Sequence, residues 1–338
     1  MPTLLLSDRD VRALLPMAEC IDVMHDALRQ LADGNAVLPL RTVLRLPDTP
    51  NAFAAMPAIV GAGRDASLGA KVITVFPGND ATPFDSHIGV VLLFAAAVGT
   101  LLAIADASSI TAIRTAAVSG LATRFLSRND SASVAMLGAG VLALPHLQAM
   151  CAVRPIRRAT IWTPSALAPG SRAQHLAERA RRELAIEVDV AESAELAVRD
   201  ADIVCTVTSS RTPVLHGDWL RPGTHVNAVG ASLRSTRELD SGAVRRAEFF
   251  ADRRESVMAE AGDFLIPLAE GVIDEAHLLA ELGAVLSGAH RGRSSRDVIT
   301  VFKSLGLAIE DVAALRHIHA RALATGLGTS VDLGGLRH

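Results

Sequence analysis

The stretch Ser133-Val-Ala-Met-Leu-Gly-Ala-Gly-Val-Leu-Ala-Leu144 decides the fold. Five apolar or small residues predict a buried strand, the glycines predict a turn, and the residues after them predict the first turn of a helix. Gly138 allows a tight turn, and Gly140 lets the backbone approach a diphosphate at the helix N-terminus. Many such turns bind nothing, so the rest of the chain must decide whether this one holds a dinucleotide.

After this stretch the sequence alternates between strand and helix patterns. Strands are predicted at 133–137, 158–163, 186–190, 202–207, 225–229 and 247–251, and helices at 141–152, 171–184, 192–199, 237–246 and 255–261. Six strands joined by helical crossovers predict a doubly wound Rossmann sheet, which favours dinucleotide binding. Two further helices are expected near 274–288, and another from Ile299 to Gly326. We expect the tail to fold back onto the N-terminal half.

The N-terminal half has a different pattern. An amphipathic helix is predicted over 20–31, followed by strands at 40–46, 53–56, 68–76, 88–94 and 101–104. Several strands without helices between them predict a mostly antiparallel or mixed sheet in a separate α+β domain. A helix from Ser109 to Leu126 follows, and 127–130 is the expected domain boundary.

Composition narrows the class of protein. The chain has 338 residues, half of them apolar, and a net charge of −3, which gives no electrostatic footprint for nucleic acid. The N-terminus resembles neither a signal nor a transit peptide, and the apolar run Val90–Val98 is too short to span a bilayer. Three distant cysteines, with Cys205 in an apolar strand, favour a reduced, cytoplasmic protein. No motif with metal-ligand spacing occurs, so we expect no metal.

Three basic residues could form a small-anion site. Lys71 lies in the apolar strand 69–76 and points either to solvent or into a cleft. Arg114 lies in the first turns of a helix, where a cation opposes the helix dipole unless an anion is near. Arg41 alternates with apolar residues and could complete a cationic pocket. An arginine fork with a lysine point charge suits a small carboxylate.

Two other segments could reach the same chemistry. His87 precedes an apolar strand and is either a capping or core histidine or a proton donor. Ligands of open α/β sheets sit at the carboxyl ends of strands, so Asn227 to Ser232 should line the nicotinamide half of a cofactor site. Asp240, Asp252 and Asp263 are interpreted as caps.

Seven segments together resemble the ornithine cyclodeaminase/μ-crystallin family. They are Gly69-Ala-Lys-Val-Ile-Thr-Val-Phe-Pro-Gly-Asn79, Ser86-His-Ile-Gly-Val-Val-Leu-Leu-Phe94, Ile110-Thr-Ala-Ile-Arg-Thr-Ala-Ala-Val-Ser119, Leu137-Gly-Ala-Gly-Val141, Ala201-Asp-Ile-Val204, Pro222-Gly-Thr-His-Val-Asn-Ala-Val-Gly230 and Thr300-Val-Phe-Lys-Ser-Leu-Gly-Leu-Ala-Ile-Glu-Asp311. The resemblance implies a homodimer. It also implies a substrate-binding and dimerisation domain formed by 1–129 and 305–338, with a Rossmann NAD(P)-binding domain at 130–304.

The resemblance also assigns site residues. It implies that Arg41, Lys71 and Arg114 bind the substrate carboxylate, with Ser232 and Leu305 near the substrate. It implies cofactor contacts from a larger set, namely His87, Arg114, Gly138, Gly140, Val141, Leu142, Thr163, Ser165, Thr208, Val226, Asn227, Ala228, Val229 and Ser304.

Three positions depart from the cyclodeaminase pattern. Ser232 stands where cyclodeaminases carry a catalytic aspartate, and serine there is similar to the ketimine reductase branch. Leu142 replaces a glutamine that contacts the cofactor. The second Rossmann strand ends in Trp162-Thr-Pro-Ser165, without an acid for a ribose 2′-hydroxyl, and Thr163, Ser165 and Arg172 could receive a 2′-phosphate. NADPH is therefore slightly favoured over NADH.

The resemblance thus predicts an NAD(P)H-dependent reductase of cyclic imine carboxylates. The expected reaction converts Δ1-pyrroline-2-carboxylate to L-proline, with Δ1-piperideine-2-carboxylate to L-pipecolate as a second reaction. The catalytic set is Arg41, Lys71, Arg114, His87 and Ser232. The imine nitrogen takes its proton either from solution or from a donor near Lys71, His87 or Ser232, and these alternatives stay open. Three other functions stay open: ornithine cyclodeaminase, alanine-type dehydrogenase, and a non-enzymatic small-ligand binding protein.

Overall fold

The computed structural model describes residues 2–335, except for the side chains of Asp80 and Ala81. The described residues form two compact units. One contains the residues up to Arg114 and those from Gly306 onward, and the other is Thr115–Leu305. Helix α3 (Ala107–Leu126) crosses this division, whereas the sequence favours a boundary near residue 129. Its second half belongs to the second unit because Thr123 Oγ1 accepts from Asn227 and Leu126 O from Thr300.

The first unit is built on a mixed sheet, as the sequence predicts. Its described strands run in the order β16-β1-β7-β6-β5-β4-β2, with β3 also paired to β4, and only β1 and β7 are parallel. The strands are β1 (Thr3–Leu6), β2 (Ala36–Val37), β3 (Thr42–Arg45), β4 (Ala52–Val60), β5 (Ser67–Val75), β6 (His87–Ala95), β7 (Leu101–Asp106) and β16 (Thr329–Val331).

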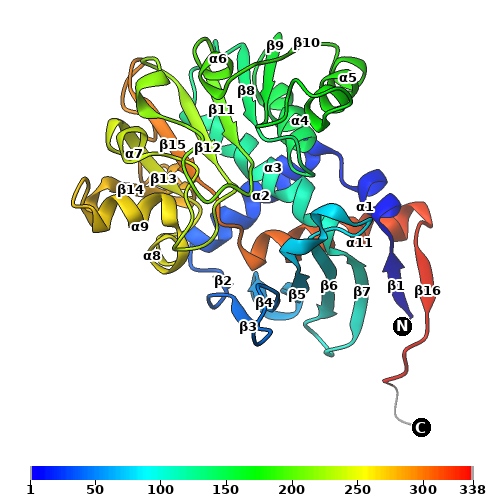
Figure 1. Ribbon diagram of the computed structural model, residues 1–338. Coiled ribbons are helices and arrows are strands. Elements are labelled where there is room, and N and C mark those ends of the chain that lie inside the picture. The colour runs from blue at the N-terminus through cyan, green and yellow to red at the C-terminus, as the bar shows by residue number, and fades with distance from the viewer. Residues whose placement is uncertain (1, 336–338) are drawn as a thin grey trace. The chain divides into compact units, whose positions relative to one another are not determined.

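Helices cover one face of this sheet. They are α1 (Asp8–Leu14), α2 (Met17–Ala32) and α11 (Ala308–Thr325), with short 3₁₀ turns at Gly63–Asp65 and Pro77–Ala81. In Figure 1, α11 lies across β4, β5 and β6 and packs beside α2. The chain after Gly306 therefore folds onto the N-terminal half, as expected. The assignment of the two units to substrate and cofactor stays a prediction.

The second unit is a doubly wound parallel sheet. Its described strands run β10-β9-β8-β11-β12-β15-β13-β14, and every pairing is parallel. They are β8 (Ser133–Leu137), β9 (Arg158–Trp162), β10 (Glu187–Val190), β11 (Ile203–Thr206), β12 (His225–Ala228), β13 (Ala247–Ala251), β14 (Leu278–Glu281) and β15 (Ile299–Lys303). The helices are α4 (Ala143–Val153), α5 (Arg172–Leu184), α6 (Ala194–Val198), α7 (Ser241–Arg246), α8 (Arg254–Glu260), α9 (Gly262–Ala269) and α10 (Leu282–Leu286), with 3₁₀ turns at Gly217–Trp219 and Glu275–His277.

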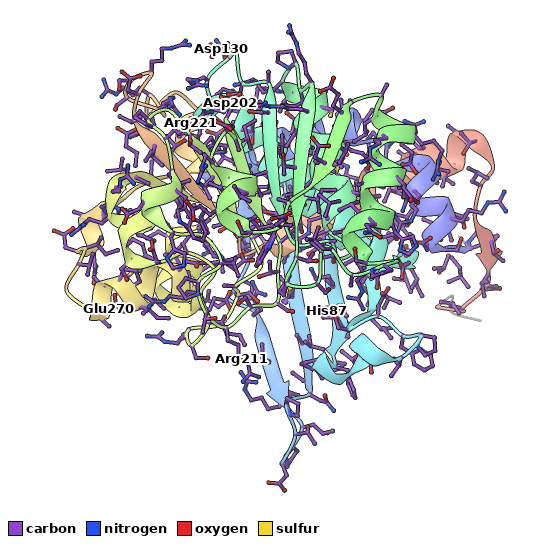
Figure 2. The ribbon with its side chains drawn as sticks, turned by 45° about the horizontal axis from the view of Figure 1, so that its top comes forward. His87, Asp130, Asp202, Arg211, Arg221 and Glu270 are labelled. Carbon is purple, nitrogen blue, oxygen red and sulfur yellow. The ribbon has the colours of Figure 1, made fainter. Side chains whose placement is uncertain are left out.

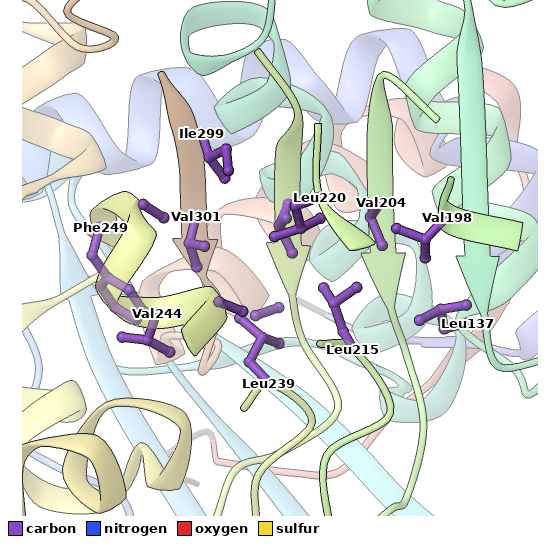
Figure 3. Close-up of a cluster of buried hydrophobic side chains, with 14 of the residues drawn as sticks. Leu137, Val198, Val204, Leu215, Leu220, Leu239, Val244, Phe249, Ile299 and Val301 are labelled. Atoms are coloured by element: carbon purple, nitrogen blue, oxygen red, sulfur yellow. The ribbon is translucent and has the colours of Figure 1, made fainter. Parts of the chain in front are cut away.

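An apolar core on one face holds this sheet to its helices. Leu137, Val204 and Val301 come from the strands, and Leu239 and Val244 pack onto them (Figure 3). At the amino ends of the strands, Asp202 accepts from Ala132 N and Ser133 N and lies 3.6 Å from Arg221 (Figure 2). Polar pairing thus occupies the amino edge of the sheet.

Two predictions of local structure are wrong. Ile299–Lys303 is not the start of a helix but β15, in the sheet between β12 and β13. A fully buried strand has no polar face to reveal its period, and Ile, Val and Phe favour strands. The segment 274–288 holds one 3₁₀ turn, β14 and the short α10 in place of two helices. The described part of the sheet therefore has eight strands, two more than predicted.

No described helix is long and apolar enough to cross a membrane.

Candidate active site

The first unit buries a cluster of cations and carboxylates. Lys71 Nζ lies 2.9 Å from Asp311 Oδ2 and 3.4 Å from Thr111 Oγ1. Arg114 donates from Nε to Asp311 Oδ1 at 2.9 Å and from Nη1 to Glu310 Oε2 at 2.5 Å. All four charged side chains are at most 3% exposed. Lys71 therefore does not point to solvent, and the anions near Arg114 include two carboxylates of the protein itself.

Strand periodicity places Lys71 on the face covered by α11. Gly69 precedes Lys71 by two residues and so shares its face of β5. A Cβ on Gly69 would lie 2.8 Å from Cγ2 of Val312, which follows Asp311 in α11. The missing side chain lets α11 approach the strand, and this close approach brings Asp311 to Lys71.

Gly306 brings the arginines together. Its φ of +77° favours glycine, and a Cβ there would lie 2.4 Å from Arg114 Nη1. Its carbonyl oxygen accepts from Arg41 Nη2 at 3.4 Å. The three predicted carboxylate-binding residues thus gather around the chain that enters α11.

Burial and neighbouring charges shift the pKa values of the two buried cations. Burial, helped by Arg114, lowers the pKa of Lys71 from 10.5 to about 8, although Asp311 opposes this shift. Burial alone would lower the pKa of Arg114, but Asp311 and Glu310 raise it. With Arg41, the cluster holds three cations and two carboxylates, so its net charge is +1 when Lys71 is protonated.

His87 lies at the start of β6 and is exposed (Figure 2). Its Nδ1 lies 3.0 Å from Ser86 Oγ. Partial burial, followed by Lys71 and Arg41, lowers its pKa. The ring is therefore neutral at neutral pH, in the field of two cations of the cluster.

The carboxyl end of the second unit's sheet fits a dinucleotide. Gly138 has a φ of +114°, and a Cβ there would lie 2.7 Å from Val207 O, whereas a Cβ on Gly140 would meet no described atom within 4 Å. The buried hydroxyls of Thr163 and Ser304 have no hydrogen-bond partner among residues 2–335. A narrow glycine turn, free space beyond it and two hydroxyls without partners are what a phosphate- and ribose-bearing ligand requires.

The remaining predicted site residues divide into those near strand ends and those in the core. Val141 and Ser165 are exposed, Leu142, Thr208 and Ser232 are half-buried, and Val229 and Leu305 are largely buried near strand ends. Val226, Asn227 and Ala228 are 0% exposed inside β12. Asn227 Nδ2 donates to Thr123 Oγ1 at 2.9 Å, so its side chain faces α3. Because these three side chains lie in the core, their expected contact with a cofactor would have to come from the backbone, and it stays a prediction.

The acidic residues that we interpreted as caps also divide. Asp240 does cap α7, since Oδ1 accepts from Ala243 N at 2.7 Å. Asp263 lies inside α9 and binds Lys303 and two backbone N–H groups, and Asp252 accepts from Leu305 N. The cap interpretation of these two residues is wrong, because long-range partners bind their carboxylates.

Sequence reasoning missed Glu310 and Asp311 as site residues. Their signal was two adjacent acids in the first turn of a helix whose residues are otherwise apolar as far as Leu315, at the end where the helix dipole favours acids. It also missed Glu238, which is fully buried and binds the loops after β11 and β12.

Known proteins are similar to this chain over most of its length. The model of the Ornithine cyclodeaminase/mu-crystallin family matches residues 1–326. The chain is 33% identical to Delta(1)-pyrroline-2-carboxylate reductase of Bacillus cereus, covering 97% of this chain and 99% of that one. It is 38% identical to ketimine reductase mu-crystallin of Mus musculus, covering 85% and 86%.

A solved structure is similar throughout. It is Thermococcus litoralis Delta(1)-pyrroline-2-carboxylate reductase in complex with NADH and L-proline, with a TM-score of 0.92 and 39% identity. The likeness covers 97% of this chain and 100% of that one. Together with the Rossmann sheet and the cation cluster, these matches show that the chain belongs to the ornithine cyclodeaminase/mu-crystallin family.

Proposed function

We propose that the protein is an NAD(P)H-dependent reductase of cyclic imine carboxylates. Its main reaction is Δ1-pyrroline-2-carboxylate to L-proline, and Δ1-piperideine-2-carboxylate to L-pipecolate is the second. The observation that carries the proposal is the cluster of buried Lys71 and Arg114 with half-buried Arg41, whose charges, summed with those of Asp311 and Glu310, give +1 for these five side chains. One monocarboxylate neutralises that charge, and the relatives of matching length reduce such substrates.

The three cations have different roles. Arg41 donates from Nη2 to the carbonyl oxygen of Gly306 at 3.4 Å, and its guanidinium has the planar fork that binds a carboxylate through two hydrogen bonds. Arg114 is held by Asp311 and Glu310 and supplies a fixed positive charge. Lys71 adds a point charge beside Thr111. Fixed cations hold the imine in one orientation, and orientation supplies much of the rate.

The second unit holds the dinucleotide in this proposal. Gly138 and Gly140 take the diphosphate, Thr163 and Ser165 the adenosine ribose, and Thr208, Val229 and Ser304 the nicotinamide side. When bound, the reduced cofactor supplies a hydride. Because no acid follows Trp162, a 2′-phosphate is not repelled, which favours NADPH over NADH.

The chain itself connects the two sets of residues. Arg114 and Thr115 are neighbours in α3, and Ser304 is two residues from Gly306, whose oxygen binds Arg41. The residues proposed for cofactor binding and those proposed for carboxylate binding therefore adjoin along the chain at Ser304 to Gly306.

The reaction needs one hydride and one proton. Hydride adds to the imine carbon, and the C=N electron pair moves to nitrogen, which takes the proton. We propose Lys71 as the proton donor, because a pKa of about 8 keeps it mostly protonated at neutral pH yet able to release its proton. His87, with its lowered pKa, is neutral there and less suited, and Ser232 offers only a weakly acidic hydroxyl.

The same proposal covers assembly and location. The outer face of the first unit's sheet exposes large apolar side chains, including Phe53, Ile59, Ile88 and Val90. Exposed apolar patches of this kind mark association surfaces. We propose that a second copy of the chain covers this face to form a homodimer in the cytoplasm. The two chain ends would then form the substrate-binding and dimerisation domain (1–129 and 305–338), and 130–304 the cofactor domain.

A substrate panel tests the function. The purified protein is given Δ1-pyrroline-2-carboxylate with NADPH or NADH, L-ornithine with NAD⁺, or L-alanine with NAD⁺. We expect cofactor oxidation with the imine and neither ammonia release from ornithine nor NAD⁺ reduction by alanine. Ammonia and proline from ornithine would overturn the proposal.

Ser232 provides an additional test. Its half-buried hydroxyl cannot replace the carboxylate base that ornithine cyclisation needs. Ser232→Asp should lose imine reduction and gain ornithine turnover, whereas Ser232→Ala should gain none.

A further inference from the structure

A buried carboxylate joins the ends of two cofactor-side strands. Glu238 is 0% exposed, and its carboxylate accepts four hydrogen bonds from the residues that the structure describes. Its Oε1 accepts from Thr208 N and Thr208 Oγ1, both at 2.7 Å, and its Oε2 accepts from Thr206 Oγ1 at 2.8 Å and Gly230 N at 2.6 Å. Thr206 ends β11, Thr208 follows it, and Gly230 follows β12, so one side chain fixes two neighbouring loops.

A second carboxylate and a lysine hold Glu238 in place. Asp263 Oδ1 accepts from the backbone N–H of Glu238 at 2.7 Å and of Leu239 at 3.0 Å. Asp263 Oδ2 lies 2.9 Å from Lys303 Nζ, and both side chains are 0% exposed. Lys303 ends β15 and directly precedes Ser304, so the network extends to a third loop on the cofactor side.

The loop at Gly230 is shaped to meet this carboxylate. A Cβ there would lie 2.1 Å from Thr208 O and 2.5 Å from Glu238 Oε1, so only glycine lets the two loops and the carboxylate come together. The short N–H···O distances, one to each oxygen, are typical of an ionised acceptor. Burial and Asp263 raise the pKa of Glu238, while Lys303 and Thr208 oppose the shift.

We infer that Glu238 is a positioning residue that fixes the nicotinamide-side loops after β11, β12 and β15, with Asp263 and Lys303 as its support. The inference rests on the proposed function, because that function places Thr208, Val229 and Ser304 at the nicotinamide half of the cofactor. Glu238 itself is 0% exposed, so it would act through these loops and not by contact with the cofactor. Its loss should weaken recognition of the nicotinamide half and spare the adenosine half, which is held at Gly138, Gly140 and Thr163.

Glu238→Gln tests this with binding alone. Glutamine keeps the shape, but its amide NH₂ must face one of the two backbone N–H donors. Affinity for NADPH or NADH, measured by fluorescence or calorimetric titration, should fall roughly 10- to 100-fold, the range expected for a lost charged hydrogen bond. Affinity for ADP-ribose and its 2′-phosphate, which lack nicotinamide, should change less than about twofold.

Asp240→Asn is the matched control. Asp240 lies two residues away and also accepts backbone N–H bonds, but from Gly217 and Ala243, away from these loops. It should leave the affinity for both kinds of ligand unchanged. Equal loss of ADP-ribose and NAD(P)H binding in Glu238→Gln, or unchanged binding of both, would overturn the inference.

Thr206 provides a milder probe if Glu238→Gln does not fold. Thr206→Val removes one hydroxyl that orients Glu238 and should weaken NAD(P)H binding a few-fold, whereas Thr206→Ser should restore it. A Thr206→Val protein that binds NAD(P)H as tightly as wild type would contradict the inference.

The wild-type protein separates this inference from the proposed function. If wild type binds the cofactor yet reduces no imine, the proposed function alone is overturned, because the binding titrations need no substrate. Wild type that binds neither cofactor would overturn both.

Discussion

Lys71 and Asp311 form an ion pair of 2.9 Å with both side chains at most 3% exposed. Neither charge is stable in that position without the other, because an unpaired buried charge is costly. Burial lowers the pKa of Lys71 and Asp311 limits the fall, leaving it at about 8. The pair thus fixes one cation of the proposed carboxylate site and sets the acidity of the proposed proton donor.

Removing Asp311 should shift the pH dependence of the reaction. Lys71 must be protonated to donate, so kcat/KM should decline as the pH rises through about 8. Asp311 raises the pKa of Lys71, so Asp311→Asn should move this decline to lower pH. Asp26→Asn, at an exposed acid paired with His25, is the control. A decline at the same pH in Asp311→Asn would show that Lys71 is not the titrating group.

Gly306→Ala should weaken substrate binding, whereas Gly326→Ala, which strains the backbone by the same amount, should not. Gly306 and Gly326 have φ values of +77° and +70°, so alanine strains the backbone equally, by roughly 1 kcal/mol. Only at Gly306 would the new Cβ meet a functional group, Arg114 Nη1 at 2.4 Å, while at Gly326 no described atom lies within 4 Å. Steady-state kinetics should show the KM for the imine raised roughly tenfold in Gly306→Ala and unchanged in Gly326→Ala. Equal KM values in the two variants would refute the close-approach argument.

Ser165→Asp should change the cofactor preference. The exposed Ser165 follows the end of β9, where an acid would bind a ribose 2′-hydroxyl and repel a 2′-phosphate. We expect the ratio of kcat/KM for NADPH to that for NADH to fall by about tenfold or more, because one like-charge contact is added. Ser165→Asn adds similar volume without the charge and should leave the ratio near that of wild type. An unchanged ratio in Ser165→Asp would show that Ser165 does not lie beside the ribose 2′-group of the cofactor.

Acid should destabilise the protein through a buried histidine. His146 is 0% exposed, with Nδ1 2.7 Å from Leu142 O and Nε2 3.1 Å from Ser119 Oγ. Burial lowers its pKa from 6.5 to about 4, so between these values the unfolded chain binds a proton that the folded chain does not. The free energy of unfolding therefore falls as the pH falls through this window.

His146→Gln removes this contribution. Urea denaturation at pH 7 and pH 5 should show a stability loss smaller than that of wild type by about 1–2 kcal/mol. His175→Gln, at an exposed histidine of α5, should lose as much as wild type. If all three proteins lose the same amount, His146 is not the acid-sensitive group.

The fold is predictable from the sequence in segments whose hydrophobic periodicity or glycine positions identify a helix, a strand or a turn. The turn at Gly138, helix α3 and the sheet of the first unit follow from local pattern. The strand at Ile299–Lys303 does not, because a strand buried on both faces shows the same apolar run as a buried helix.

The charged site is predictable only in part. Arg114 in the first turns of a helix signals a nearby anion, but no local pattern reveals that Glu310 and Asp311, almost 200 residues later, supply two of them. The burial of Lys71 depends in the same way on α11 crossing β5. These partners come from tertiary packing, which single-sequence periodicity does not encode.

The stoichiometry of imine reduction tests the proposed reaction most directly. Wild-type protein is incubated with Δ1-pyrroline-2-carboxylate and NADPH or NADH, and cofactor oxidation is followed at 340 nm together with chiral analysis of the product. We expect one L-proline to form for each cofactor oxidised, with turnover lost in Lys71→Ala. Binding of the cofactor without its oxidation by the imine, or proline appearing from ornithine in place of the imine, would contradict it.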